Sequence, residues 1–545
     1  MGNKPEGRRG DDLPPCAVEF IRQVVRRMWY RRKARRDVQA ELTAHFEDAV
    51  RDCATAEEKE CRARELIEGF GNAKLLASLC HRAKKRCRPL WLKALLRSGQ
   101  GLGLALLYGV VCTLPLLLAR PTIRVDYGQW LSNHWRPGTP DAENAKVYYD
   151  KAAVLYVEPA QGLEEKMRLR RWSSFGFSDS DVQSIEAWLA KNQAAFQALR
   201  RGASTLQYWS TYDSNECHSN ASRPLLAGLV TAQMKTLLPL GWWGMTFAFK
   251  QQIIWEAKRG EVAKALDDCL VLRRVGRHLQ NKGSLPDQMI GVAIETLSYG
   301  GIIAFLPNAD FSPGLLEFVQ KELLTSFDLR RQIMCLDYEK ALWYDEIQRT
   351  FTDDGKGGGR ALAEGLFYAS GDWKGNLLNT VRFRYPDRRQ TIAMVDRYFL
   401  WAQERLNTPP DAEHLGEPND SSRAPTTNSM FSLTPAYHGR LALMGWQLKT
   451  HEIGVITLLA IQRYFRATGS YPDRLDQLVG QGYLKELPKD PFGQGLLTYK
   501  RTDEGFLLYS WGADRKDDGG QLGTGSEGQP RNWADNGDWV FWPAP

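Results

Sequence analysis

The feature that most constrains this chain is a run of 22 consecutive uncharged residues from Ser98 to Ala119. As a helix, with about 1.5 Å of rise per residue, such a run spans the roughly 30 Å hydrocarbon core of a bilayer. Helices of globular proteins rarely extend so far without a charged residue. We therefore predict a transmembrane helix within residues 91–120, and the alternative is a buried core helix.

The charges around this run predict its orientation. Residues 1–97 carry 23 lysines and arginines against 14 aspartates and glutamates, whereas the remaining chain carries 49 against 50. Basic side chains alone occupy the charged positions from Arg82 to Arg97, and only Arg120 and Arg124 follow the run closely. Basic residues favour the cytoplasmic side of a membrane. We expect an inner-membrane protein with a cytoplasmic N-terminus and a periplasmic C-terminal region.

Composition and periodicity predict a mainly α fold. The chain is 43% hydrophobic and 25% charged, which is ordinary globular composition and excludes disordered, collagen-like and coiled-coil classes. We expect an N-terminal helical bundle, one transmembrane helix, a large irregular helical domain and a small α+β head. The corresponding ranges are 1–90 for the cytoplasmic prefix domain, 91–120 for the transmembrane helix, 125–430 for the extracytoplasmic helical domain and 440–545 for the head.

The prefix domain is expected to contain four helices, because four segments place apolar residues at helical spacing between turn-forming residues. These segments are Val18–Arg36, Val38–Cys53, Ala56–Phe70 and Ala73–Lys85, with the first break at Asp37.

Two sequence patterns in this domain carry a family resemblance. They are V-x-x-E-L-x-x-H-F-E-D-A at 38–49 and R-E-L-I-x-x-F-G-x-x-K-x-L-A at 64–77. Together they resemble the HAAS or permease-prefix helical domain that precedes membrane segments in bacterial proteins. The resemblance implies a cytoplasmic regulatory or interaction module.

The basic run at 31–36 has two interpretations. It could contact nucleic-acid phosphates, but a solvated or lipid-facing helix surface is commoner, and anionic lipid accounts for the juxtamembrane charges. We therefore predict a membrane partner and favour no nucleic acid.

The large helical domain shows no convincing internal period. One segment, Ala257–Gly283, resembles a single tetratricopeptide-like hairpin, so an irregular helical array is the favoured prediction and a repeat array the alternative. The apolar stretch Leu285–Leu306 is interrupted by Asp287 and Glu295, which predicts a core helix and not a second membrane span.

The sequence contains no recognisable catalytic or cofactor motif. The glycine-rich segment at 353–360 lacks the G-x-x-x-x-G-K-[ST] pattern of a phosphate loop, and neither H-E-x-x-H nor G-x-S-x-G occurs. We predict no catalytic residue and no nucleotide cofactor. Carboxylates that converge in the folded chain cannot be recognised from their spacing, so an envelope hydrolase stays an alternative.

The most specific signal lies at the C-terminus. An amphipathic helix from Ile453 to Phe465 is followed by T-G-S-Y-P at 468–472, L-P-K-D-P-F-G at 487–493 and S-W-G-A-D at 510–514. Two strands, at 497–500 and 506–510, are predicted to form a hairpin. These motifs, in this order, resemble the globular head of the major pseudopilin of type II secretion.

The resemblance implies a calcium ion in the loop that closes the head. Carboxylates in a glycine-rich turn repel one another unless a hard cation takes oxygens from them. Asp514 and Asp535 match the family's loop best, and local chemistry adds Asp518 and Asp538 as candidate ligands. The alternative is a solvated acidic turn. Residues 515–534 are longer than the family's loop, which puts the ligand set in doubt.

The position of the membrane run departs from the pseudopilin pattern. A pseudopilin begins with its apolar helix, whereas here the run lies several hundred residues before the head, so assembly into a pilus is not expected. The combination resembles envelope proteins of planctomycete-type bacteria. We expect a non-enzymatic envelope scaffold or adaptor that binds protein partners, linked to type II secretion. The alternatives are a transmembrane sensor that signals through the prefix domain, and the envelope hydrolase.

Overall fold

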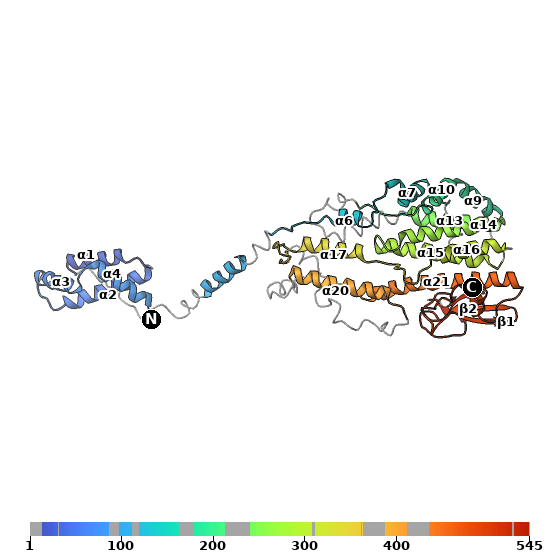
Figure 1. The fold of residues 1–545 in the computed structure, drawn as a ribbon. Coiled ribbons are helices and arrows are strands. Elements are labelled where there is room, and N and C mark those ends of the chain that lie inside the picture. Colours follow the sequence, from blue (N-terminus) through green and yellow to red (C-terminus); the bar gives the residue numbers. More distant parts are fainter. Residues whose placement is uncertain are drawn as a thin grey trace. The chain divides into compact units, whose positions relative to one another are not determined.

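The computed structural model describes residues 13–30, 32–86, 98–111, 119–160, 162, 179–212, 240–307, 311–360, 362, 387–410, 435–525 and 528–543. Contacts between residues divide the chain into two compact units, Met1–Pro115 and Leu116–Pro545. The described part is mainly helical, as predicted, and its few strands lie near the C-terminus (Figure 1).

The first unit contains the predicted helical bundle. Its helices are α1 (Pro15–Arg27), α2 (Arg32–Ala49), α3 (Ala56–Phe70) and α4 (Ala73–Arg86). The rings of Phe20, Phe46 and Phe70 meet in the core, with centroids 5.9 to 6.3 Å apart. Thr55 and Glu58 form a capping box that begins α3, which satisfies two amide groups that a helix start leaves unpaired.

The predicted break at Asp37 was wrong, because Asp37 lies inside α2. The chain breaks instead after Arg27, where Met28 adopts an extended conformation and buries its side chain. Val38 and Phe46 lie on the buried face of α2. Tertiary burial therefore decided the boundary, and the turn-forming tendency of an aspartate did not.

The described part of the uncharged run, Ser98–Val111, is a helix. All its described residues are exposed except Gly109, which is half-buried. Its large apolar side chains are 55% to 68% exposed and cover about two thirds of the helix circumference, whereas the remaining face carries Gly101, Ala105 and Gly109. The large apolar side chains are Leu102, Leu104, Leu106, Leu107, Tyr108, Val110 and Val111.

The second unit begins with a helical body. Its described helices are α6 (Tyr127–His134), the short helix η1 (Asp141–Glu143), α7 (Ala145–Leu155), α9 (Asp179–Lys191), α10 (Gln193–Ala203), α13 (Leu240–Lys258), α14 (Val262–Leu279), α15 (Leu285–Phe305), α16 (Pro313–Thr325), α17 (Asp337–Thr350) and α20 (Arg388–Asn407). Residues 326–336 form the loop that joins α16 to α17.

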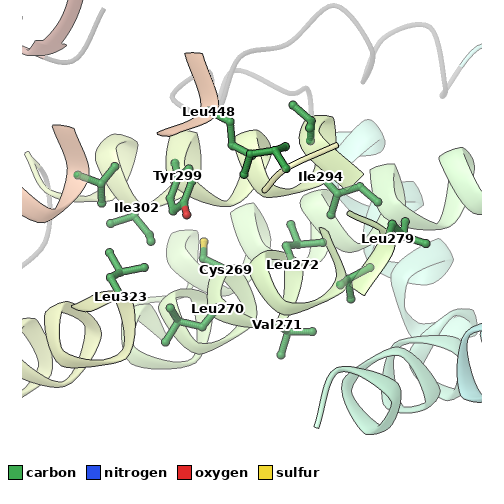
Figure 2. Packing of buried hydrophobic residues seen from close by; sticks show 14 of the residues in the cluster. Cys269, Leu270, Val271, Leu272, Leu279, Ile294, Tyr299, Ile302, Leu323 and Leu448 are labelled. Carbon is green, nitrogen blue, oxygen red and sulfur yellow. The ribbon is translucent and has the colours of Figure 1, made fainter. Parts of the chain in front are cut away.

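Helices α14 and α15 form the centre of this body. Figure 2 shows Leu272 of α14 and Ile294 and Tyr299 of α15 among the buried side chains around their contact. The two helices approach closely at a pair of glycines. A Cβ atom added to Gly276 would lie 2.6 Å from the carbonyl oxygen of Gly291, and the reverse addition meets the same distance. Only glycine allows the two backbones to come this near.

Helix α15 is, within the described residues, the one helix that is long and apolar enough to cross a membrane by length and composition, with a mean hydropathy of 1.3. However, 61% of that apolar window is buried inside the unit. Its Glu295 is fully buried and bonded to arginines. The prediction of a core helix at Leu285–Leu306 is therefore confirmed.

The C-terminal region combines one long helix with small sheets. After α21 (Pro435–Thr468) and α22 (Asp476–Gly480) come β1 (Thr498–Thr502), β2 (Gly505–Ser510), β3 (Gly523–Thr524), β4 (Pro530–Arg531) and β5 (Trp539–Trp542). The main sheet is antiparallel in the order β1-β2-β5, and β3 pairs with β4. The predicted hairpin is confirmed, with Thr502 paired to Gly505 across the turn.

Helix α21 belongs to both parts of the second unit. It packs against α15, α16 and α20 of the body and against β2 and β5 of the sheet (Figure 1). At Gly454 an added Cβ atom would lie 2.2 Å from the Phe541 ring, so the sheet lies directly on the helix backbone there. The predicted domain boundary at 430–440 falls partly in residues 411–434, which lie outside the described residues.

Candidate functional site

The acidic loop of the head contains the four predicted metal ligands, and Asp538 is the most deeply buried of them. Its side chain is 0% exposed, and its Oδ2 accepts a hydrogen bond of 2.6 Å from the Gly520 amide. Its Oδ1 is buried without a hydrogen-bond partner among the described residues. Burial raises the pKa of Asp538 to about 6, and the nearby charges of Asp518 and Asp517 act in the same direction. The fold therefore brings Asp518 and Asp538 together.

The other two predicted ligands make different contacts. Asp535 is exposed and forms an ion pair of 2.5 Å with Arg440 of α21. Asp514 accepts a hydrogen bond of 3.2 Å from the Lys516 amide. Neither contact joins the pair formed by Asp518 and Asp538.

A carboxylate that the sequence analysis missed, Asp517, lies in the same loop. It accepts hydrogen bonds from the Tyr509 hydroxyl (2.7 Å) and the Gly519 amide (3.0 Å). Both contacts lower its pKa. The signal that could have singled it out is its position directly before Asp518.

The structure brings together two of the four predicted calcium ligands, Asp518 and Asp538. Calcium takes six to eight oxygens, many of them from backbone and water. The unpartnered, buried oxygen of Asp538 beside Asp518 is suited to such an ion. Within the described ranges, however, no group of three or more His, Cys, Asp or Glu side chains is arranged to hold a metal. Asp518 and Asp538 are the side chains that would hold calcium.

Buried charges join the head-bearing helix α21 to the body. Glu452 of α21 accepts hydrogen bonds from Arg273 (2.7 Å) and Arg277 (2.5 Å) of α14. Arg277 also bonds Glu295 of α15 at 2.8 Å. Burial opposes ionisation of Glu295, but Arg331, Arg277 and Arg273 hold its pKa well below the usual range. This network ties three helices together with nearly every charge paired.

Two buried carboxyls, Asp287 and Glu339, also lie near each other and bear on the hydrolase alternative. Burial raises the pKa of Asp287 to about 6 and that of Glu339 to about 8. Asp287 forms a capping box with Ser284 at the start of α15, and Glu339 accepts a 2.7 Å hydrogen bond from the Leu285 amide. The cavity beside Asp287 is about 10 Å³, room for one water. Capping of α15 therefore accounts for Asp287 and for one oxygen of Glu339, whereas Glu339 Oε2 is buried without a hydrogen-bond partner among the described residues.

A cavity of about 860 Å³ lies where the head meets the body. Its walls come from α13, α15, α21 and the segment after α7, and Trp533 of the head completes them. The apolar wall residues of the three helices are Phe247, Val292, Ala293, Leu297, Met444 and Leu448. A cavity of this size and lining is typical of small-molecule sites.

One lysine lines this apolar cavity. Lys250 of α13 is largely buried, and burial lowers its pKa. Tyr156, Thr246, Thr296 and Gln447 add polar groups to the wall, and Glu158 adds an exposed carboxylate. Sequence reasoning missed this site, because its residues come from segments hundreds of positions apart. The only local signal was a lysine directly after an apolar stretch.

Comparisons with known proteins add no homologue to this picture. No family model, no curated protein and no solved structure matches the chain. Function is therefore argued from the geometry of this chain.

Proposed function

We propose that this chain is a single-pass, membrane-anchored envelope scaffold or adaptor. In this proposal residues 98–119 cross the inner membrane, the bundle of α1 to α4 is cytoplasmic and the chain after residue 119 is periplasmic. The observation that carries the proposal is the helix Ser98–Val111, whose seven large apolar side chains are all more than half exposed. Seven such side chains favour lipid over water by on the order of 10 kcal/mol.

The charges ahead of this helix support the proposed orientation. All charged side chains within residues 82–97 are basic, so anionic lipid of the cytoplasmic leaflet would attract them. The HAAS-like first unit would then act as an interaction module in the cytoplasm.

The head is proposed to be pseudopilin-like and to bind protein partners of the envelope, among them secretion machinery. Support comes from the way its motifs meet. Asp490 of the L-P-K-D-P-F-G motif accepts 3.0 Å hydrogen bonds from the Phe492 amide and from the hydroxyl of Ser510, which begins S-W-G-A-D. The Phe492 ring packs on Trp539 of β5, with centroids 4.6 Å apart. Motifs that are distant in sequence thus build one small core.

A labelling experiment tests the anchor and its orientation. In intact bacteria a membrane-impermeant maleimide should label Asp503→Cys, an exposed position in the β1–β2 turn, above the level of the unchanged chain. The exposed Cys61 of α3 should react only after permeabilisation, and Cys61→Ser identifies its signal. Labelling of Cys61 alone in intact cells, or of both sites only after lysis, would contradict the proposal.

Carbonate extraction tests insertion separately. The unchanged chain should stay in the membrane pellet at alkaline pH. Leu106→Arg places a charge in the apolar run, costs about 3 kcal/mol of insertion and should release a large fraction of the chain. Leu106→Phe is the matched control and should stay in the pellet.

The proposed calcium loop has its own test. Calcium should raise the melting temperature of the full chain, and Asp538→Asn should remove the rise. Asp503→Asn, an exposed carboxylate outside the loop, should leave it intact. Because the pKa of Asp538 is about 6 without metal, calcium affinity should fall as the pH drops through that value. A calcium response that survives Asp538→Asn would remove the loop from the proposal.

One observation favours the sensor as a second candidate. The cavity of about 860 Å³ lies between the head and the body, so a ligand bound there could alter the conformation of the second unit. Deletion of residues 1–90 separates the two functions. A sensor would lose its effect on gene expression while external partners stay bound, whereas a scaffold would show no change in expression.

A further inference from the structure

We propose that the cavity between α13, α15 and α21 binds a single-chain amphiphile, with its alkyl chain among the apolar walls and its anionic head group at Lys250. This binding activity is independent of the membrane anchor and of the calcium loop.

The size and lining of the cavity point to this class of ligand. Small-molecule sites enclose about 300 to 1,000 Å³, and this cavity of about 860 Å³ has room for an alkyl chain and a head group. Phe247, Leu297 and Met444 give it walls from three different helices. Apolar walls of this extent gain from removing an alkyl chain from water.

Lys250 and Glu158 are the charged residues that line the cavity. Glu158 is exposed whereas Lys250 is partly buried, so a head group inside the cavity meets the charge of Lys250. Burial disfavours its ammonium form, and an anion beside it reverses that effect. A carboxylate or phosphate in the cavity would therefore bind more tightly than a neutral head group on the same chain. Thr246, one turn before Lys250 on α13, places a hydroxyl in the same wall for hydrogen bonding to the acid.

The ligand would also contact both parts of the second unit. Leu448 and Gln447 lie on α21, and Trp533 belongs to the head. The ring of Trp533 packs against His451 of α21 with centroids 4.4 Å apart. An occupied cavity should therefore stabilise the junction of head and body, which raises the melting temperature by ligand linkage.

The test uses the full chain held in amphipol, with calorimetric titration and thermal melting. Palmitate and palmitoyl lysophosphatidate should bind saturably and raise the melting temperature, whereas hexadecanol should bind about tenfold or more weakly. Lys250→Gln should weaken palmitate binding about tenfold or more and leave hexadecanol unchanged. Lys258→Gln, an exposed lysine on the same helix, is the matched control and should change neither.

A second variant tests the location. Ala293→Trp fills the cavity and should abolish binding of all three probes, and circular dichroism checks that the variant is folded. If it does not fold, the comparison of Lys250→Gln with Lys258→Gln decides alone. The relative affinities of palmitate and lysophosphatidate distinguish a carboxylate from a phosphate head group. Absence of saturable binding, or hexadecanol binding as tight as palmitate, would overturn the proposal.

Discussion

Two helices of this chain have similar apolar character and opposite surroundings. The helix Ser98–Val111 exposes its leucines and valines, whereas α15 buries most of its apolar window inside the second unit. The differences lie in the polar and small residues. Helix α15 carries Glu295, which arginines neutralise, and Gly291, which admits a neighbouring backbone. The run 98–119 has no charge, and none of its helical glycines has an atom of another segment near its Cβ position. Length and hydropathy alone therefore do not tell a core helix from a membrane helix.

The largest expected effect comes from removing the charge in α15. Glu295→Gln leaves Arg273, Arg277 and Arg331 around one remaining carboxylate, that of Glu452. Breaking a buried ion pair from one side destabilises a protein by about 3–5 kcal/mol. Chemical denaturation of the full chain, followed at the transition of the second unit, measures this loss.

A surface ion pair provides the control for Glu295. Glu317 is 63% exposed and pairs with Arg463 at 3.1 Å, so Glu317→Gln should cost less than about 1 kcal/mol. Equal effects of the two variants would show that the buried network does not hold α15 in place.

The second effect concerns backbone contact. Gly276→Ala or Gly291→Ala forces a methyl group to within 2.6 Å of a carbonyl oxygen, so α14 and α15 must separate. We expect a loss of about 3 kcal/mol, measured by the same denaturation. Gly103→Ala is the matched change in the exposed helix, where nothing lies within 4 Å. It should leave the stability of the second unit unchanged, and a similar loss there would break the comparison.

Several parts of the fold could be predicted because their signals are local. The hairpin of β1 and β2 follows from alternation and a turn, and the charges in Leu285–Leu306 indicated a core helix. The start of α2 could not be predicted, because the burial of Met28 depends on other helices.

The sites were less predictable, for the same reason. The sequence placed Asp535 in the calcium loop, but Arg440, which is 95 positions away, pairs with it. The cavity had almost no local signal, since Lys250, Thr296, Gln447 and Trp533 meet only after folding. Long-range pairing therefore decides which carboxylates are available and where a cavity forms.

A pH effect of moderate size should further distinguish α15 from the helix Ser98–Val111. The pKa of Glu339, which caps α15, is about 8 in the folded chain against 4.5 for an ordinary glutamate. The unfolded chain therefore releases this proton first, and the stability that Glu339 contributes falls as the pH rises from 4.5 to 8. The loss between pH 6 and 8 is about 2 kcal/mol. The run 98–119 has no carboxyl or amino side chain, so its membrane association should not follow this titration.

The measurement compares melting temperatures of variants across pH. Glu339→Gln keeps an acceptor for the Leu285 amide and has no charge to bury. Its melting temperature should therefore rise steadily, relative to that of the unchanged chain, from pH 6 to 8. Glu486 is an exposed glutamate of the head, so the melting temperature of Glu486→Gln should follow the same pH dependence as that of the unchanged chain. Parallel curves for all three proteins would show that Glu339 does not titrate with folding.

The smallest expected effect is that of shortening an exposed leucine in the helix Ser98–Val111. Leu104 is 68% exposed, so Leu104→Ala removes no packing within the protein and should change the unfolding free energy of the second unit by less than about 0.5 kcal/mol. Leu272→Ala makes the same chemical change at a fully buried site of α14 beside α15 and should cost about 2–5 kcal/mol. Both are read from one denaturation series. Because a membrane helix meets lipid and a core helix meets protein, a large loss in Leu104→Ala would place the run 98–119 inside a protein core and contradict the proposed anchor.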